Sequence, residues 1–143
     1  MAEKLFTNIL VATDGSDRNI TAVEEAIRIA TGCGAALNAV YVIDAGTFES
    51  ASADVVMEDT YRIIKAEAEQ ALKQVRSLSG NIEVKTTVIE GKPAQEIVRF
   101  ATAEKIDLIV IGTQGKKGIE RILLGSVAES IIRLAGCKVL VVK

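Results

Sequence analysis

Histidine is absent from the 143 residues of this chain. That absence excludes Ser-His-Asp and Cys-His nucleophilic mechanisms, together with every metal site built on imidazole. Aromatic residues make up only 3% of the chain and are not interleaved with lysine and arginine, so a base-stacking surface for nucleic acid is not expected. The formal net charge of −2 supplies no strong field that would draw the protein to DNA, RNA or acidic lipid.

Cysteine is scarce as well, and long apolar runs are missing. Cys33 and Cys137 are too few and too far apart in sequence to indicate a disulfide framework or a zinc site. No apolar run approaches the roughly 20 residues that span a bilayer, and the first residues show no secretion-signal pattern. We therefore expect a cytoplasmic protein that binds neither nucleic acid nor membrane.

Hydrophobic residues account for 49% of the chain, and they fall in a regular order. Short apolar runs alternate with amphipathic segments, which predicts one α/β domain over residues 1–143 with a doubly wound, Rossmann-like, five-stranded parallel sheet. The expected strands and helices alternate, with strands at 5–12, 35–43, 82–89, 108–111 and 138–142 and helices at 17–31, 55–78, 93–104 and 126–136.

The strand patterns differ in what they indicate about the edges of the sheet. Residues 82–89 alternate between apolar and polar side chains, which is typical of an edge strand with one wet side. The segment Val139–Val142 is apolar throughout and comes last in the chain. At a sheet edge its free N–H and C=O groups would form a template for a second copy, giving a homodimer. The alternative is cover from the helices of the same chain.

A glycine-rich loop follows the apolar run 108–111 and leads into a helix. Its marked positions are Gly112, Gly115, Gly125 and Ser126. Glycine allows close approach of a ligand to the backbone, and a helix start offers unpaired N–H groups and a positive dipole end, so this pattern favours a bound phosphate. A capping box of Ser126 and Glu129 is also expected here. The alternative is a long turn followed by an ordinary helix cap.

The first strand ends in VATDGS, where a dinucleotide fingerprint would carry glycines. Asp14 would repel a pyrophosphate, but its carboxylate suits ribose hydroxyls or a divalent cation. The alternative is an Asx-turn in which Ser16 or Asp17 caps the next helix. A Walker A motif is also missing. The loop also carries cationic side chains, which could either neutralise a phosphate or lie in solvent: Lys116, Lys117 and Arg121.

Four segments of this sequence together resemble the universal stress proteins: NILVATDGS, YVID, EGKPAQEI and the pattern G-x2-G-x9-G-S. The resemblance extends over essentially the whole chain. It implies a sheet in the order 3-2-1-4-5 and a homodimer through Val139–Val142. For the nucleotide-binding branch of the family it also implies bound ATP, with Mg²⁺ or Mn²⁺ held by the phosphates.

Carried over position by position, the resemblance implies a set of nucleotide contacts. Asp14 would lie near the ribose, and the adenine would meet Ala12, Val42 and Ile111. The remaining contacts, to ribose and phosphates, would come from Gly112, Gly115, Gly125, Ser126 and Val127. Some relatives carry proline at Ala12 or histidine at Gln114, so proton transfer by that histidine is not expected here.

Three functions follow from these patterns in order of support. The first is a dimeric ATP-binding regulatory protein of the stress response. The second is a slow ATPase or nucleotidyl-transferring enzyme, for which no base–nucleophile pair and no catalytic residue can be identified. The third is a nucleotide-free interaction scaffold.

Overall fold

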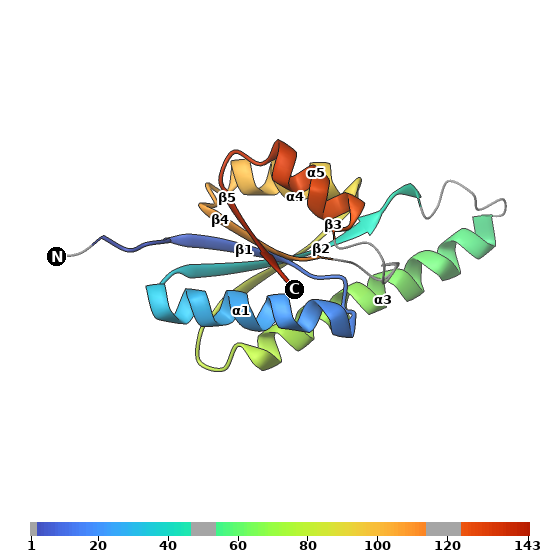
Figure 1. The fold of residues 1–143 in the computed structure, drawn as a ribbon. Coiled ribbons are helices and arrows are strands. Elements are labelled where there is room, and N and C mark those ends of the chain that lie inside the picture. The colour runs from blue at the N-terminus through green and yellow to red at the C-terminus, as the bar shows by residue number, and fades with distance from the viewer. Residues whose placement is uncertain (1–2, 47–53, 114–123) are drawn as a thin grey trace.

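The computed structural model describes residues 3–46, 54–113 and 124–143. Within them, five strands pair in parallel in the order β3-β2-β1-β4-β5, as predicted (Figure 1). The strands are β1 (Asn8–Ala12), β2 (Ala36–Asp44), β3 (Val84–Gly91), β4 (Leu108–Gly112) and β5 (Lys138–Val142). The helices are α1 (Asp17–Cys33), α3 (Asp54–Leu78), α4 (Pro93–Ala103) and α5 (Ser126–Leu134).

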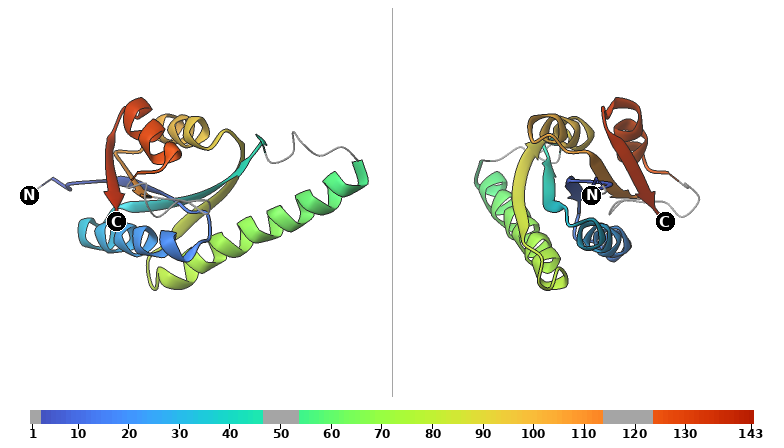
Figure 2. Two further views of the ribbon diagram at one scale, coloured as in Figure 1. Left: turned by 45° about the vertical axis from the view of Figure 1, so that its right-hand side comes forward. Right: turned by 90° about the vertical axis from the view of Figure 1, so that its left-hand side faces the viewer.

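Helices cover both faces of the sheet, with α1 and α3 on one face and α4 and α5 on the other (Figures 1 and 2). Successive side chains of a strand point to opposite faces. In β1, Ile9 and Val11 therefore join the cluster under α1 and α3, while Leu10 joins the cluster under α4 and α5. Each of these three side chains is fully buried, which stabilises the fold by about 1.5–3 kcal/mol apiece. Burial on both sides explains the continuous apolar runs in the sequence.

The ends of the elements differ slightly from those predicted. The first strand begins at Asn8 rather than residue 5, and Leu5 is 78% exposed. Helix α1 continues past residue 31, the predicted end, to Cys33. Its C-cap is Gly34, whose left-handed φ of 64° lets Ala35 donate its N–H to the Ala30 carbonyl. None of the helices in the described ranges is both long and apolar enough to cross a membrane.

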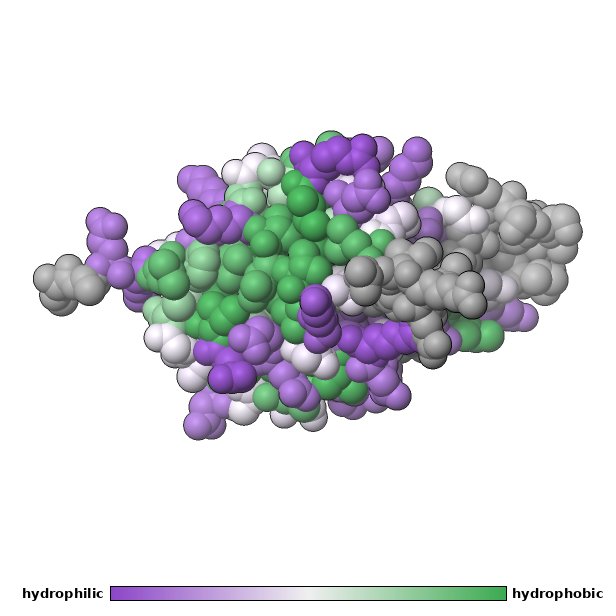
Figure 3. Space-filling model, viewed as in Figure 1, coloured by the Kyte–Doolittle hydropathy of each residue, from purple (hydrophilic) through white to green (hydrophobic). Residues whose placement is uncertain are grey.

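Both predicted sheet edges are confirmed: β3 and β5 are the outer strands. The side chains of β5 are half-buried beside each core cluster, with Val139 and Val141 on the α4/α5 side and Leu140 and Val142 on the other. Figure 3 shows a continuous hydrophobic area on the face where β5 crosses the front of the molecule in Figure 1. Cover from the chain's own helices is thus partial at this edge.

A carboxylate connects β1 to β4 at the amino ends of the strands. Asp107 accepts hydrogen bonds from the Thr7 N–H (2.8 Å), the Thr7 hydroxyl (3.0 Å) and the Asn8 N–H (3.1 Å). Partial burial of the carboxyl raises its pKa, but the hydrogen bonds from Thr7 and Asn8 together outweigh that effect and lower the pKa of Asp107. The ionised form of Asp107 therefore stabilises this end of the sheet.

Candidate functional site

The sheet has a switch point at its centre, because β1 pairs with β2 on one side and with β4 on the other. The chain leaves the carboxyl end of β1 toward α1 on one face and the carboxyl end of β4 toward α5 on the other, which opens a crevice between β1 and β4. The residues predicted from the sequence follow or end these strands. The candidate site has three parts: an apolar row, the start of α5 and the turn at Asp14.

The apolar row crosses three neighbouring strands. Ala12 pairs with Val40, and Val42 lies two residues further along β2 on the same face. Because Val11 pairs with Val110, the next residue of each strand brings Ala12 beside Ile111. All three side chains belong to or pack against the cluster under α4 and α5. Ala12, Val42 and Ile111 thus share one face, as three residues of one base pocket must.

The glycine-rich loop is closed at its base by a backbone hydrogen bond. Gly112 ends β4, and the N–H of Gly125 donates to the Thr113 carbonyl at 2.6 Å. This bond brings the start of α5 next to the end of β4. The rest of the loop lies outside the described residues, and with it Gly115 and the three loop cations, Lys116, Lys117 and Arg121.

The predicted capping box at the start of α5 is wrong. Gly125 is the N-cap and Ser126 is already the first helical residue, so Ser126 does not stand at the cap position that the box requires. The Glu129 carboxylate lies 3.3 Å from Arg133, one turn further along the same helix. Its N-cap, Gly125, has no side chain to cap the first N–H groups of α5, and Ser126 and Val127, which carry two of them, are exposed. The positive end of the helix dipole is therefore directed at the crevice.

Asp14 lies in two overlapping side-chain turns. The Gly15 N–H donates to the Thr13 hydroxyl oxygen (3.1 Å). The Ser16 N–H (2.9 Å) and the Ser16 hydroxyl (2.6 Å) both donate to Asp14 Oδ1. The Asx-turn considered as an alternative is therefore present, and it orients the carboxylate. Ser16 is the N-cap residue of α1 by position, yet its side chain makes no cap hydrogen bond.

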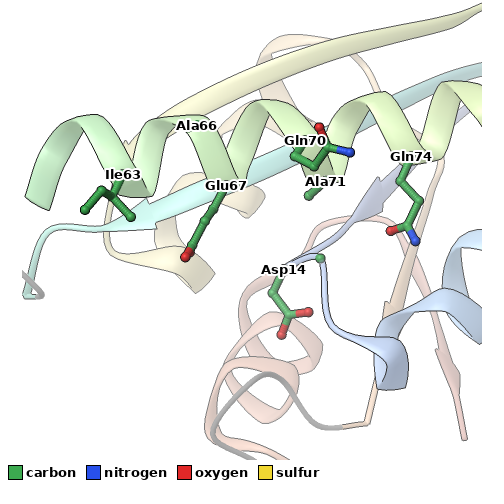
Figure 4. Close-up of a pocket in the computed structure, with 8 residues that line it drawn as sticks. Asp14, Ile63, Ala66, Glu67, Gln70, Ala71 and Gln74 are labelled. Atoms are coloured by element: carbon green, nitrogen blue, oxygen red, sulfur yellow. The ribbon is translucent and has the colours of Figure 1, made fainter.

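A groove of about 600 Å³ runs between the Asp14 turn and α3 (Figure 4). Its walls include Asp14 and Gly15 on one side and Ile63, Glu67, Gln70 and Gln74 of α3 on the other. Among the residues that the structure describes, Asp14 is the one that both lines this groove and is a predicted nucleotide contact. The Asp14 carboxylate is turned away from α3. The groove and the apolar row therefore occupy different sides of the same turn.

Helix α3 shapes the site in a way that sequence reasoning missed. Gly15 has a φ of +78°, and a Cβ built on it would lie 3.0 Å from the Ala71 Cβ. The Asp14 turn is therefore packed directly on α3, and even a Cβ at Gly15 would crowd Ala71. The small size of Ala71 within an apolar helix stripe was the available signal, but spacing alone does not say which loop the helix meets.

These parts have complementary chemistry. Uncapped N–H groups at a helix start suit an anion, an oriented carboxylate suits a polyhydroxyl group, and an apolar row suits a flat ring. The three features lie at one end of the sheet, around a single switch point. The arrangement therefore offers matching chemistry to a ligand that combines those three groups.

Comparisons with known proteins agree with this description. The model of the universal stress protein family matches residues 5–143. A universal stress protein of Methanocaldococcus jannaschii is 46% identical over 143 residues, covering 99% of this chain and 84% of the relative. Among solved structures, universal stress protein UspA from Lactobacillus plantarum is 33% identical with a TM-score of 0.84 and full coverage of both chains. Another, a universal stress protein in complex with cAMP, is 26% identical with a TM-score of 0.68 and 96% coverage of each chain. This chain belongs to the universal stress protein family.

Proposed function

We propose that this chain is an ATP-binding regulatory protein of the stress response that acts as a homodimer. The observation that carries the proposal is the exposed start of α5 with a glycine as its N-cap, at the same end of the sheet as Asp14 and the apolar row. The universal stress protein solved with cAMP, 26% identical, supports an adenine nucleotide as the ligand class.

In this proposal each part of the nucleotide has its own contacts. Adenine lies against the apolar row, and the ribose hydroxyls donate to Asp14. The phosphates accept hydrogen bonds from the backbone of Gly112, Gly115, Gly125, Ser126 and Val127, and Mg²⁺ or Mn²⁺ is held by the phosphates. A few charge-assisted hydrogen bonds at about 1.5–3 kcal/mol each, after the cost of association, support a dissociation constant on the order of micromolar.

Nucleotide release and calorimetry test the proposal. The purified protein is heat-denatured, and the supernatant is analysed for adenine nucleotides by mass spectrometry; ATP is then titrated into nucleotide-free protein. We expect a Gly125→Val variant to bind at least about tenfold more weakly, because its side chain occupies the phosphate position. Gly136→Val is the control, since a Cβ at Gly136 meets nothing within 4 Å. The absence of copurified nucleotide, together with no binding at millimolar ATP, would end the proposal.

The proposed homodimer uses the free edge of β5. An edge strand exposes unpaired backbone groups, and the hydrophobic area around β5 would be buried by a second copy (Figure 3). Sedimentation should give the mass of a dimer for the wild type and of a monomer for Val141→Lys. Ile63→Lys, at a 61% exposed residue on α3, should stay dimeric. A monomeric wild type at micromolar concentration would contradict the dimer.

A further inference from the structure

We propose that Ser16 is a positioning residue for nucleotide recognition. Its hydroxyl fixes the Asp14 carboxylate so that Oδ2 is presented to a ribose hydroxyl, and the site thereby distinguishes ribonucleotides from deoxyribonucleotides. This assignment rests on the proposed ATP site and deepens it, because it concerns which sugar that site accepts.

The Ser16 hydroxyl is committed to Asp14 rather than to helix α1. A serine at an N-cap ordinarily accepts a hydrogen bond from the N–H two or three residues further on. Ser16 stands at that position and makes no such bond. Its hydroxyl instead donates to Asp14 Oδ1 at 2.6 Å, within the range of short charge-assisted O–H···O⁻ bonds. The side chain therefore acts on the carboxylate and contributes no cap to the helix.

Both hydrogen bonds from Ser16 reach the same oxygen of Asp14. The backbone N–H donates to Oδ1 at 2.9 Å, and the hydroxyl shares that acceptor. Two donors from different directions hold the carboxylate in one rotation about its Cβ–Cγ bond, which is otherwise broad for aspartate. Oδ2 is then the oxygen directed at the ligand. Without the hydroxyl, one N–H remains and that rotation is less restricted.

The backbone under Asp14 is held independently of Ser16. The buried Thr13 donates its N–H to Val40 at 3.0 Å and accepts the Gly15 N–H on its hydroxyl oxygen at 3.1 Å. Gly15 packs against Ala71 of α3. With the turn fixed on these sides, removal of the Ser16 hydroxyl changes the orientation of one carboxylate and leaves the path of the chain unchanged.

Sugar discrimination separates this role from a merely structural one. A loop that Ser16 only stabilised would lose affinity for ATP and deoxy-ATP equally, and the protein would melt earlier. A positioning role lowers the affinity for ATP selectively. The ratio of dissociation constants for the deoxy and ribo forms is therefore the informative quantity.

The experiment measures binding of ATP, 2′-deoxy-ATP and 3′-deoxy-ATP by calorimetry to the wild type, Ser16→Ala, Ser16→Thr and Asp14→Ala. We expect the wild type to prefer ATP over one deoxy form by about tenfold, as one charge-assisted hydrogen bond allows. Ser16→Ala should reduce the preference to about threefold or less, and Ser16→Thr, which keeps the hydroxyl, should restore it. Asp14→Ala should abolish it. Melting temperatures without nucleotide should agree within about 2 °C between the wild type and Ser16→Thr, which keeps the hydroxyl.

Three results would overturn the assignment. One is a Ser16→Ala variant that keeps the wild-type ratio while Asp14→Ala loses it. Another is an equal loss of affinity for all three nucleotides in Ser16→Ala. The third is a wild type that binds ATP and both deoxy forms equally well; that result refutes sugar discrimination but not ATP binding. A wild type that binds no nucleotide refutes the proposed function itself and is recognised separately.

Discussion

Replacement of Gly15 with alanine tests the packing that positions the Asp14 turn. Two costs combine at this residue. A left-handed φ of +78° is unfavourable for alanine by about 1–2 kcal/mol. The new Cβ would also lie 3.0 Å from the Ala71 Cβ, an overpacked contact that costs roughly 1–3 kcal/mol. We expect the free energy of unfolding to fall by about 2–5 kcal/mol in total.

Gly80 provides a matched control for the first cost. Its φ is +62°, and a Cβ there would meet nothing within 4 Å, so Gly80→Ala carries backbone strain without a clash. We expect Gly80→Ala to lose only about 1–2 kcal/mol. The excess in Gly15→Ala should largely disappear in the double variant with Ala71→Gly, after correction for the single Ala71→Gly change.

Urea denaturation of all four variants at one protein concentration, followed by circular dichroism, measures these free energies. The coupling between residues 15 and 71 should be at least about 1 kcal/mol. Equal losses in Gly15→Ala and Gly80→Ala, or a coupling near zero, would show that the turn does not bear on α3. The account of how the Asp14 turn is held would then be refuted.

Four further variants test other parts of the fold by urea denaturation. Asp107→Ala should lose about 1–2 kcal/mol at pH 7. The pKa of Asp107 is lowered in the folded state, so its ionised carboxylate stabilises the protein fully above the unfolded-state pKa of about 3.9. This stabilisation is lost as the pH falls through the folded-state pKa, and the stabilities of wild type and variant should then converge. A difference that stays constant with pH would contradict this. Lys105 holds a left-handed φ of 55° after α4, and Lys105→Gly should gain about 0.5–1 kcal/mol, whereas a loss would contradict the strain. Ile131→Ala should lose about 2–5 kcal/mol and Ile132→Ala less than about 1, because Ile131 is fully buried and Ile132 is 47% exposed; equal losses would contradict the assigned helix face.

Most of the fold could be predicted from the sequence because its signals are local and repeated. Apolar runs bounded by glycine gave the strands, and the alternating pattern of 82–89 correctly identified an edge. The order of strands came from family resemblance, since periodicity does not determine which strands pair. The observed ends of strands and helices differ from the predicted ends by one to three residues. Leu5 was placed in the first strand because it is apolar, but its side chain is solvent-exposed, and the sequence does not show that exposure.

The site was predicted less completely because it depends on where side chains point. The period of two along a strand does place Ala12, Val42 and Ile111 on one face once the register is known. The capping box failed because Gly125 takes the cap position and moves Ser126 into the helix. The contact between Gly15 and Ala71 joins residues 56 positions apart, and no local pattern contains that information.

The most direct test of the central claim, that the start of α5 binds the phosphates of ATP, is an amide NMR titration of the ¹⁵N-labelled protein with ATP. We expect the largest shift changes at the backbone amides of Gly125, Ser126 and Val127, with smaller changes near Asp14. Changes confined to the α3 side of the groove, at Gln70 and Gln74, would contradict the claim, as would spectra unchanged at millimolar ATP.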